Sequence, residues 1–167
     1  MSETCDLPPC LPYSDRVPVL LAVDPGTDKV GFAVVRYDLK VVEQGVLYVS
    51  EFHRVLRRII PDAKPEVLVL GSGTAAHLVI EILKDLGFGG EPGGAGGCGG
   101  ASPPIRMADE FRTSEEARRR YFAENPTTGI WRFVPLGLQI PPRPVDDYAA
   151  VIIGERYVRK NGLYVAR

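Results

Sequence analysis

Acidic side chains occur at three separate places where an element of secondary structure is predicted to begin or end. Asp24 closes the apolar run that starts at Val19 and is followed by Pro25-Gly26-Thr27. Asp109-Glu110 ends a second short run, and Asp146-Asp147 opens a segment with helical periodicity. Each group alone has a plain structural explanation, because Asp-Pro-Gly is good turn chemistry and Asp is a good helix N-cap.

Taken together, these acids indicate a metal site. Converging carboxylates repel one another, and divalent cations relieve the repulsion; oxygen ligands suit Mg²⁺ or Mn²⁺. Adjacent acids in an extended segment point to opposite faces, so at most one of Asp109 and Glu110 can serve a given site directly. Two such ions about 4 Å apart can activate a water and stabilise the leaving oxygen of a phosphodiester. The residue types therefore predict a site for divalent cations, which could support chemistry of this kind.

Periodicity predicts the elements that must position these acids. Apolar and β-branched runs predict strands at 19–24, 30–37, 40–49, 67–70 and 105–109. Helical spacing predicts helices at 51–60, 74–86, 113–122 and 146–160, of which the first is ended by Pro61 and the third begins with a capping box at Thr113. The first strands have very short connections and form an antiparallel meander. We expect an α/β domain with a five-stranded mixed sheet, its first three strands antiparallel, and helices on both faces.

The domain is predicted to span residues 17–162, between a flexible tail at 1–16 and a short C-terminal tail at 163–167. Within it, residues 87–103 form a predicted mobile loop. The segment 87–101 holds nine of the 18 glycines, and it cannot gain enough burial to offset its chain entropy.

Composition limits the function classes. The formal net charge is −1, so any phosphate binding must come from a local patch or from metal ions. Arginine clusters at 54–58 and 118–120 are either solvated helix faces or phosphate contacts. The three cysteines form no C-x-x-C pair, which argues against a zinc site or a disulfide framework. With strand-sized apolar runs and an acidic N-terminus unlike a signal peptide, we expect a cytoplasmic protein without a membrane span.

Three motifs in the sequence resemble the YqgF/RuvX family. They are Asp24-Pro-Gly-Thr-Asp-Lys-Val-Gly31, Asp109-Glu110 with Thr113, Ser114, Glu116 and Ala117 in step, and Val145-Asp-Asp-Tyr-Ala-Ala-Val-Ile-Ile-Gly-Glu-Arg-Tyr157. That family has a ribonuclease H-like fold and is related to the Holliday junction resolvase RuvC. Its members are described as junction resolvases and as nucleases that mature the precursor of small-subunit ribosomal RNA. The resemblance spans residues 19–160, without the Gly-rich segment and most of 124–142.

The resemblance implies a nuclease acting on structured RNA, such as a ribosomal RNA precursor, or on branched DNA, leaving a 5′-phosphate and a 3′-hydroxyl. Asp24, Glu110 and Asp146 would be the catalytic acids that hold two Mg²⁺ or Mn²⁺ ions, with Asp147 as a reserve ligand. The residues that would contact nucleic acid are Thr27, Lys29, Arg112 and Arg143. Both a monomer and a homodimer stay open, although junction resolution needs two active sites and hence a dimer.

Some positions depart from the family pattern and leave two alternatives open. Where the family has Arg directly after the Asp-Glu pair, this chain has Phe111, and Gly71-Ser72-Gly73 replaces Gly-Leu-Pro after the fourth strand. The first alternative is a nucleotide- or dinucleotide-binding module, because strand 67–70, the turn Gly71 to Ala76 and the next helix form a Gly-x-Gly-x-x-Ala fingerprint. The second is a non-catalytic interaction protein that retains the ribonuclease H fold.

Overall fold

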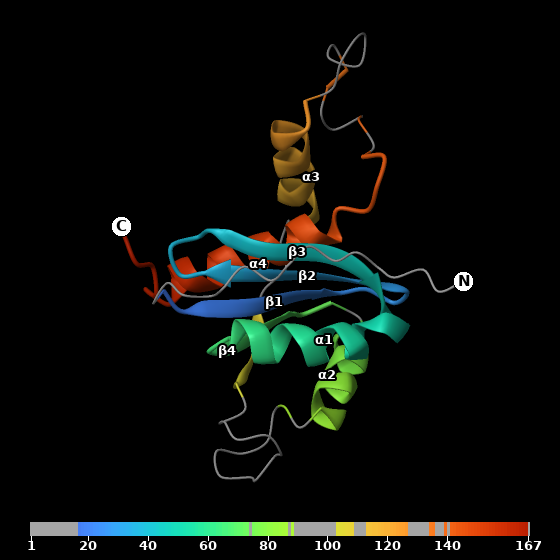
Figure 1. The fold of residues 1–167 in the computed structure, drawn as a ribbon. Helices are drawn as coiled ribbons and strands as arrows, with labels where there is room; N and C mark the ends of the chain where they lie inside the picture. Colours follow the sequence, from blue (N-terminus) through green and yellow to red (C-terminus); the bar gives the residue numbers. More distant parts are fainter. Residues whose placement is uncertain are drawn as a thin grey trace, which may run out of the picture.

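The computed structural model describes residues 17–73, 75–86, 88, 103–108, 113–126, 134–135, 139 and 141–166. The elements, drawn in Figure 1, are β1 (Val19–Pro25), β2 (Lys29–Arg36), β3 (Val41–Tyr48), α1 (Val49–Ala63), β4 (Val67–Gly71), α2 (Ala76–Asp85), β5 (Ile105–Ala108), α3 (Thr113–Glu124) and α4 (Asp146–Lys160). The predicted tail at 1–16 and most of the predicted loop at 87–103 lie outside the described residues. No helix in the described part of the chain is long and apolar enough to span a membrane.

A five-stranded sheet in the order β3-β2-β1-β4-β5 forms the centre of the fold. Strands β1, β2 and β3 pair antiparallel, because only short turns join them. Strands β4 and β5 are reached through helices and run parallel to β1. The predicted mixed sheet with its first three strands antiparallel is therefore confirmed.

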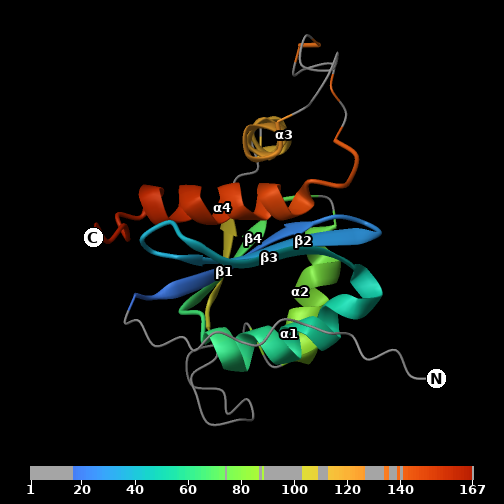
Figure 2. The same ribbon diagram turned by 45° about the horizontal axis from the view of Figure 1, so that its top comes forward.

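Helices cover both faces of the sheet, as predicted. Figure 2 shows α1 and α2 on one face, α4 along the other, and α3 crossing the outer side of α4. Leu21 and Val23 of β1 face α1 and α2, whereas Leu20 and Ala22 face α4. β1 is buried on both faces, which explains why its sequence is a continuous apolar run.

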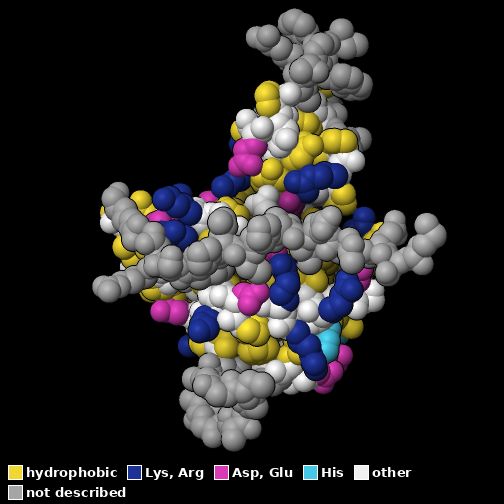
Figure 3. All heavy atoms as spheres, in the orientation of Figure 1, with side chains coloured by type: hydrophobic (Ala, Val, Ile, Leu, Met, Phe, Trp, Pro, Cys, Tyr) yellow, Lys and Arg dark blue, Asp and Glu magenta, His cyan; other side chains and the backbone are white. Residues whose placement is uncertain are grey.

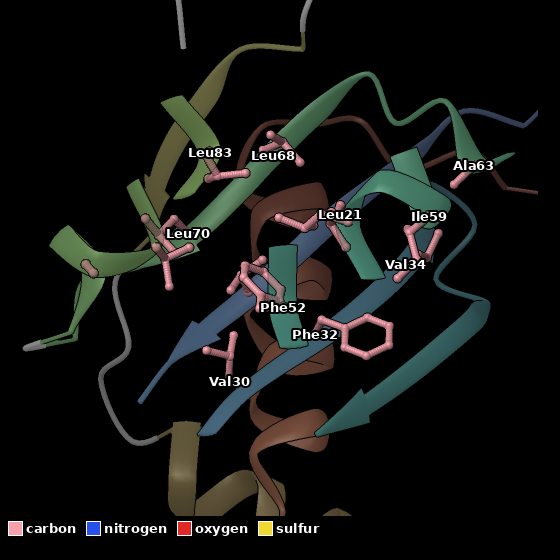
Figure 4. Close-up of a cluster of buried hydrophobic side chains, with 14 of the residues drawn as sticks. Leu21, Val30, Phe32, Val34, Phe52, Ile59, Ala63, Leu68, Leu70 and Leu83 are labelled. Atoms are coloured by element: carbon pink, nitrogen blue, oxygen red, sulfur yellow. The ribbon is translucent and has the colours of Figure 1, made fainter. Parts of the chain in front are cut away.

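A hydrophobic core joins the sheet to α1 and α2. Figure 4 shows Phe52 of α1 and Leu83 of α2 directed towards Leu21 and Leu68 of the central strands. All four side chains are almost fully buried. Burial of each contributes roughly 1.5–3 kcal/mol relative to exposure. This core holds β1 and β4 as a rigid support for the residues at their ends.

Helix α4 is buried on two sides. Ala150 and Ile153 pack on the sheet, while Ala149 packs on α3. A Cβ added at Gly154 would lie 3.0–3.2 Å from side-chain atoms of the sheet, so the absence of a side chain here allows close packing of the helix. The small residues of α4 therefore seat the helix close to the sheet, which fixes the position of its N-terminal aspartates.

The prediction that Pro61 ends the first helix is wrong. Pro61 lies inside α1, which continues to Ala63. Proline cannot donate the hydrogen bond to the carbonyl four residues earlier, and its ring crowds that carbonyl, but the helix continues for two residues beyond it. The helix instead ends at Lys64, which has φ of 48° and donates its N–H to the Ile60 carbonyl at 2.9 Å. The other element boundaries agree with prediction to within two residues.

Candidate active site

Asp24 lies near the end of β1, where the strand leaves the apolar core. In the antiparallel pairing with β2 it is opposite Gly31. Strand alternation places its side chain on the same face as Leu20 and Ala22, the face covered by α4. Asp24 is half-buried. The sheet therefore holds this carboxyl group next to the helix that carries Asp146 and Asp147.

Gly31 allows the N-terminus of α4 to approach the sheet. A Cβ added at Gly31 would lie 2.1 Å from the carbonyl oxygen of Asp146 and 2.9 Å from its Cβ, so no larger side chain fits. Asp24 is the cross-strand neighbour of Gly31 on this face, and the Cβ atoms of such pairs are about 5 Å apart. The Cβ atoms of Asp24 and Asp146 are consequently within about 8 Å of each other. The predicted acids of β1 and α4 are thus neighbours.

The surroundings of Asp146 disfavour its ionised form. Burial raises the pKa of the Asp146 carboxyl, the charge of Asp147 raises it further, and the charge of Lys29 lowers it. Lys29 is the first residue of β2, and its Nζ lies 5.5 Å from the centroid of the Tyr48 ring. A divalent cation would supply the additional positive charge that favours the carboxylate.

Asp147 has a different environment from Asp146. It is 2% exposed, and its Oδ2 accepts hydrogen bonds from Arg143 Nη1 at 3.0 Å and from Gln44 Nε2 at 3.3 Å. Its Oδ1 is buried and has no donor among the described residues. A buried carboxylate oxygen without a partner is costly, and a bound cation is one group that satisfies it.

Arg143 is the counter-ion of Asp147. Its guanidinium also lies 5.5 Å from the ring centroids of both Tyr121 and Tyr148. Burial alone would lower the pKa of Arg143, but the hydrogen bond and the charge of Asp147 outweigh burial and raise it. Arg143 is predicted to contact nucleic acid. A bound phosphate would therefore have to share the Arg143 guanidinium with the buried Asp147 carboxylate.

The other predicted site residues fall in two groups. Thr27 is exposed in the turn between β1 and β2. Glu110 and Arg112 lie within 109–112, outside the described residues. They follow β5, whose last residue, Ala108, pairs with Gly71 at the end of β4. Because β1, β4 and β5 are parallel, Ala108 and Asp24 lie at the same, carboxyl ends of their strands, and residues 109–112 follow Ala108. Without that segment, the described residues contain no group of three His, Cys, Asp or Glu side chains that could hold a metal ion.

Sequence reasoning missed the residues that support Asp147 from other elements. Gln44 on β3 is 103 residues away from Asp147 in sequence, and a single sequence carries no signal for such a contact. Tyr121 on α3 meets Tyr148 edge-to-face, with ring centroids 5.7 Å apart. These contacts arise only when α4 is placed between the sheet and α3.

Several cations in the two predicted arginine clusters are paired with acids. On α3, Arg119 lies 2.7 Å from Glu115, and Arg120 lies 2.6 Å from Glu155 of α4. On α1, Arg58 pairs with Glu43 of β3. Figure 3 shows Lys and Arg side chains intermingled with Asp and Glu over the face in view. These pairs favour the interpretation of the clusters as solvated helix faces.

The turn between β4 and α2 has the predicted strand–turn–helix order. However, α2 begins at Ala76, and its N-cap residue, Ala75, makes no side-chain capping hydrogen bond. The turn also belongs to a mixed sheet, whereas dinucleotide-binding folds are built on a mostly parallel one. The fold therefore disfavours the dinucleotide-binding alternative.

Comparison with known proteins defines the class of fold. No protein-family model matches the sequence, and no curated protein matches it. RuvC from Thermus thermophilus is structurally similar at 13% identity and a TM-score of 0.50, over 86% of this chain and 96% of that one. A Fowlpox virus resolvase, solved with Holliday junction DNA, is similar at 12% identity and a TM-score of 0.52, over 86% of this chain and 98% of its own. The chain thus has a ribonuclease H-like fold of the RuvC type, as the sequence resemblance implied.

Proposed function

We propose that this protein is a metal-dependent nuclease that hydrolyses phosphodiester bonds in branched DNA. The proposal rests on the closeness of Asp24 and Asp146. Asp24 pairs with Gly31 across the sheet, and the backbone of Asp146 lies against Gly31. Fold alone does not define activity, so the acids are the decisive feature. Support for the substrate class comes from the similar viral resolvase, which was solved with Holliday junction DNA.

Two of the described acids suit a divalent cation, and Glu110 would complete the set of three carboxylates. Asp24 and Asp146 offer oxygen donors next to Gly31, and Asp147 Oδ1 has no hydrogen-bond partner among the described residues. Asp24 and Asp146 would hold the cation together with Glu110, and Asp147 would be a further ligand. When bound, such cations neutralise charge on the reacting phosphoryl group and make a water more acidic.

Other residues of the chain would orient the substrate and the acids. Thr27 is exposed in the β1–β2 turn, and Lys29 is the first residue of β2. Both follow Asp24 closely in the chain and could contact phosphate oxygens. Gly31 and the Arg143–Asp147 pair hold the first turn of α4 against the sheet. This fixed geometry would keep the acids in place for in-line attack on the phosphorus, which is the contribution that positioning makes to catalysis.

Cleavage of a labelled four-way DNA junction with Mg²⁺ or Mn²⁺ tests the proposal. We expect Asp24→Asn, Asp146→Asn and Glu110→Gln each to lower the rate at least about 100-fold, as loss of one group that stabilises transition-state charge does. Asp85→Asn, in an exposed residue of α2 on the opposite face of the sheet, is the matched control and should keep full activity. The proposal fails if wild type and the Asp24 and Asp146 variants share the same trace activity.

A structured RNA resembling a ribosomal precursor belongs in the same assay. Faster cleavage of the RNA than of the junction, with the same dependence on Asp24 and Asp146, would reassign the substrate and keep the chemistry. Resolution of a junction also needs two active sites, so we expect sedimentation to show two protein chains on one junction.

A further inference from the structure

A pocket of about 900 Å³ opens between β5 and the C-terminal half of α4, and neither Asp24 nor Asp146 lines it. Its lining includes four cationic residues: Arg106 on β5, and Arg156, Arg159 and Lys160 on α4. No acidic residue lines it among the described residues. For a protein with a formal net charge of −1, this is a marked local concentration of positive charge.

The pocket exists because α4 does not extend over β5. The helix packs mainly on β1, β2 and β3 and only slightly on β4. In the β4–β5 pairing, Arg106 is opposite Val69, whose side chain belongs to the core under α4. Arg106 is therefore on the α4 side of the sheet, where no described helix covers it, and is exposed.

Most of the positive charge in this pocket is not neutralised within the described part of the protein. Arg156 pairs with Glu116 at 2.7 Å. Arg106, Arg159 and Lys160 are exposed and form no ion pair with any described residue. The arginine clusters on α1 and α3 differ, because several of their cations face acids at short range. These three cations favour an anionic ligand supplied from outside.

We infer that this basic pocket binds the phosphate backbone of a nucleic acid substrate several nucleotides away from the bond that is cleaved. The inference rests on the proposed function, because it needs a scissile bond at Asp24 and Asp146. Arginine presents a fork of donors that suits phosphate oxygens, and an open pocket of this size admits a continuous strand.

The length of α4 sets the spacing between the pocket and the acids. Arg156 follows Asp146 by ten residues in the same helix, which corresponds to about 15 Å at 1.5 Å per residue. One strand of B-form DNA rises about 3.4 Å per nucleotide. Arg159, which has no acidic partner among the described residues, follows Asp146 by thirteen residues, or about 20 Å. The pocket accordingly contacts phosphates about four to six nucleotides from the scissile bond.

Binding of a four-way junction, measured by fluorescence anisotropy in EDTA across a range of salt concentrations, tests this inference. Removing one cation that binds a phosphate should flatten the plot of log K against log salt by about 0.9. The double variant Arg106→Ala/Arg159→Ala should therefore bind more weakly, with a slope reduced by about 1.8. The matched control is Arg57→Ala/Lys84→Ala, two exposed cations on the opposite side of the sheet, which should leave affinity and slope unchanged.

Several results would overturn the inference. It is wrong if the two double variants bind equally, if wild type binds no junction, or if ATP at equal phosphate concentration displaces the junction and thereby identifies a mononucleotide site. Unchanged circular dichroism and melting exclude misfolding, as expected for exposed positions.

The cleavage and binding assays distinguish a wrong nuclease proposal from a wrong assignment of the basic pocket. If the pocket variant binds weakly while wild type does not cleave with Mg²⁺ or Mn²⁺, the pocket is a phosphate-backbone site, but the nuclease activity and the spacing from a scissile bond are both wrong. If wild type cleaves and the pocket variant binds normally, only the pocket assignment is wrong.

Discussion

Two adjacent aspartates at the start of α4 have different environments. Asp146 is half-buried beside Gly31 and close to Asp24. Asp147 is buried and tied to Arg143 and Gln44. Neighbouring helix residues point about 100° apart, so one short motif can face both the sheet end and the interior. Substitutions at the two positions should consequently give different results.

Asp146 should reduce the stability of the metal-free protein at neutral pH. Because burial and then Asp147 raise its pKa in the folded state, the unfolded chain releases this proton first as pH rises. Stability therefore falls as pH increases from the ordinary Asp pKa through the raised value and stays lower above it. Asp146→Asn should stabilise metal-free protein at pH 7 by about 1 kcal/mol or less, since the half-exposed side chain is screened by solvent.

Urea unfolding in EDTA at a series of pH values measures this effect. The difference between Asp146→Asn and wild type should vanish near about pH 3, where the carboxyl is protonated in both states. A variant that is less stable than wild type at pH 7 would contradict the prediction.

Arg143→Ala should destabilise the fold because it leaves the Asp147 carboxylate buried without its counter-ion. Breaking a fully buried pair costs about 3–5 kcal/mol. The cost here should be smaller, about 1–3 kcal/mol, since the Arg143 side chain is 46% exposed. In a double-mutant cycle with Asp147→Asn, the double variant should lose less stability than the sum of the single variants. Additive losses in urea unfolding would show that the pair is not coupled.

At the scale of the elements, the seat of α4 on the sheet determines whether the acids meet. Gly31→Ala introduces a Cβ that clashes with backbone and Cβ atoms of Asp146, so the first turn of α4 must move. We expect a stability loss of about 1–3 kcal/mol and a much larger proportional loss of nuclease activity. Gly154→Ala is the matched control, since its Cβ meets only side-chain atoms at 3.0–3.2 Å, further along the same helix.

Thermal melting and junction cleavage of both glycine variants distinguish a local effect from a general one. Gly154→Ala should lose stability without an equal loss of activity. If the two variants lose activity in proportion to stability, the position of α4 at Gly31 is not specifically required.

The sequence was sufficient to predict the elements but not all of their contacts. β1 and β4 were found because strands buried on both faces are continuous apolar runs, and α4 because its apolar residues recur at helical spacing. The prediction for Pro61 is wrong, because a proline in the last turn weakens a helix without having to end it at that residue. Gln44 could not be assigned, because its contact with Asp147 depends on how α4 packs across β3.

In the candidate site too, the sequence predicts the key residues but not the contacts that bring them together. Asp24 and Asp146 were singled out by residue type at element ends, and their proximity depends on a glycine whose role the periodicity does not reveal. Arg106 of the basic pocket carried no signal, because its importance comes from the absence of a helix over β5 among the described elements.

At the scale of the whole molecule, α4 separates charge along its length. Asp146 and Asp147 occupy its first turn, and Arg159 and Lys160 its last. This distribution suits the helix dipole, which favours acids at the N-terminus and cations at the C-terminus. It also gives one face of the sheet an acidic end suited to cations and a basic end suited to phosphates. A nucleic acid strand that follows α4 would meet both.

Divalent cations should stabilise the entire fold if the acidic end binds them. A cation that binds only the folded protein adds about 2.7 kcal/mol at 100 times its dissociation constant. For a domain of this size, that corresponds to an increase in melting temperature of about 5–10 °C. Mn²⁺ or Mg²⁺ should produce this shift in wild type and in the Asp85→Asn control, and EDTA should reverse it. Asp24→Asn and Asp146→Asn should abolish it. An equal shift in all four proteins would place the bound cation elsewhere and leave the acidic end without its proposed ligand.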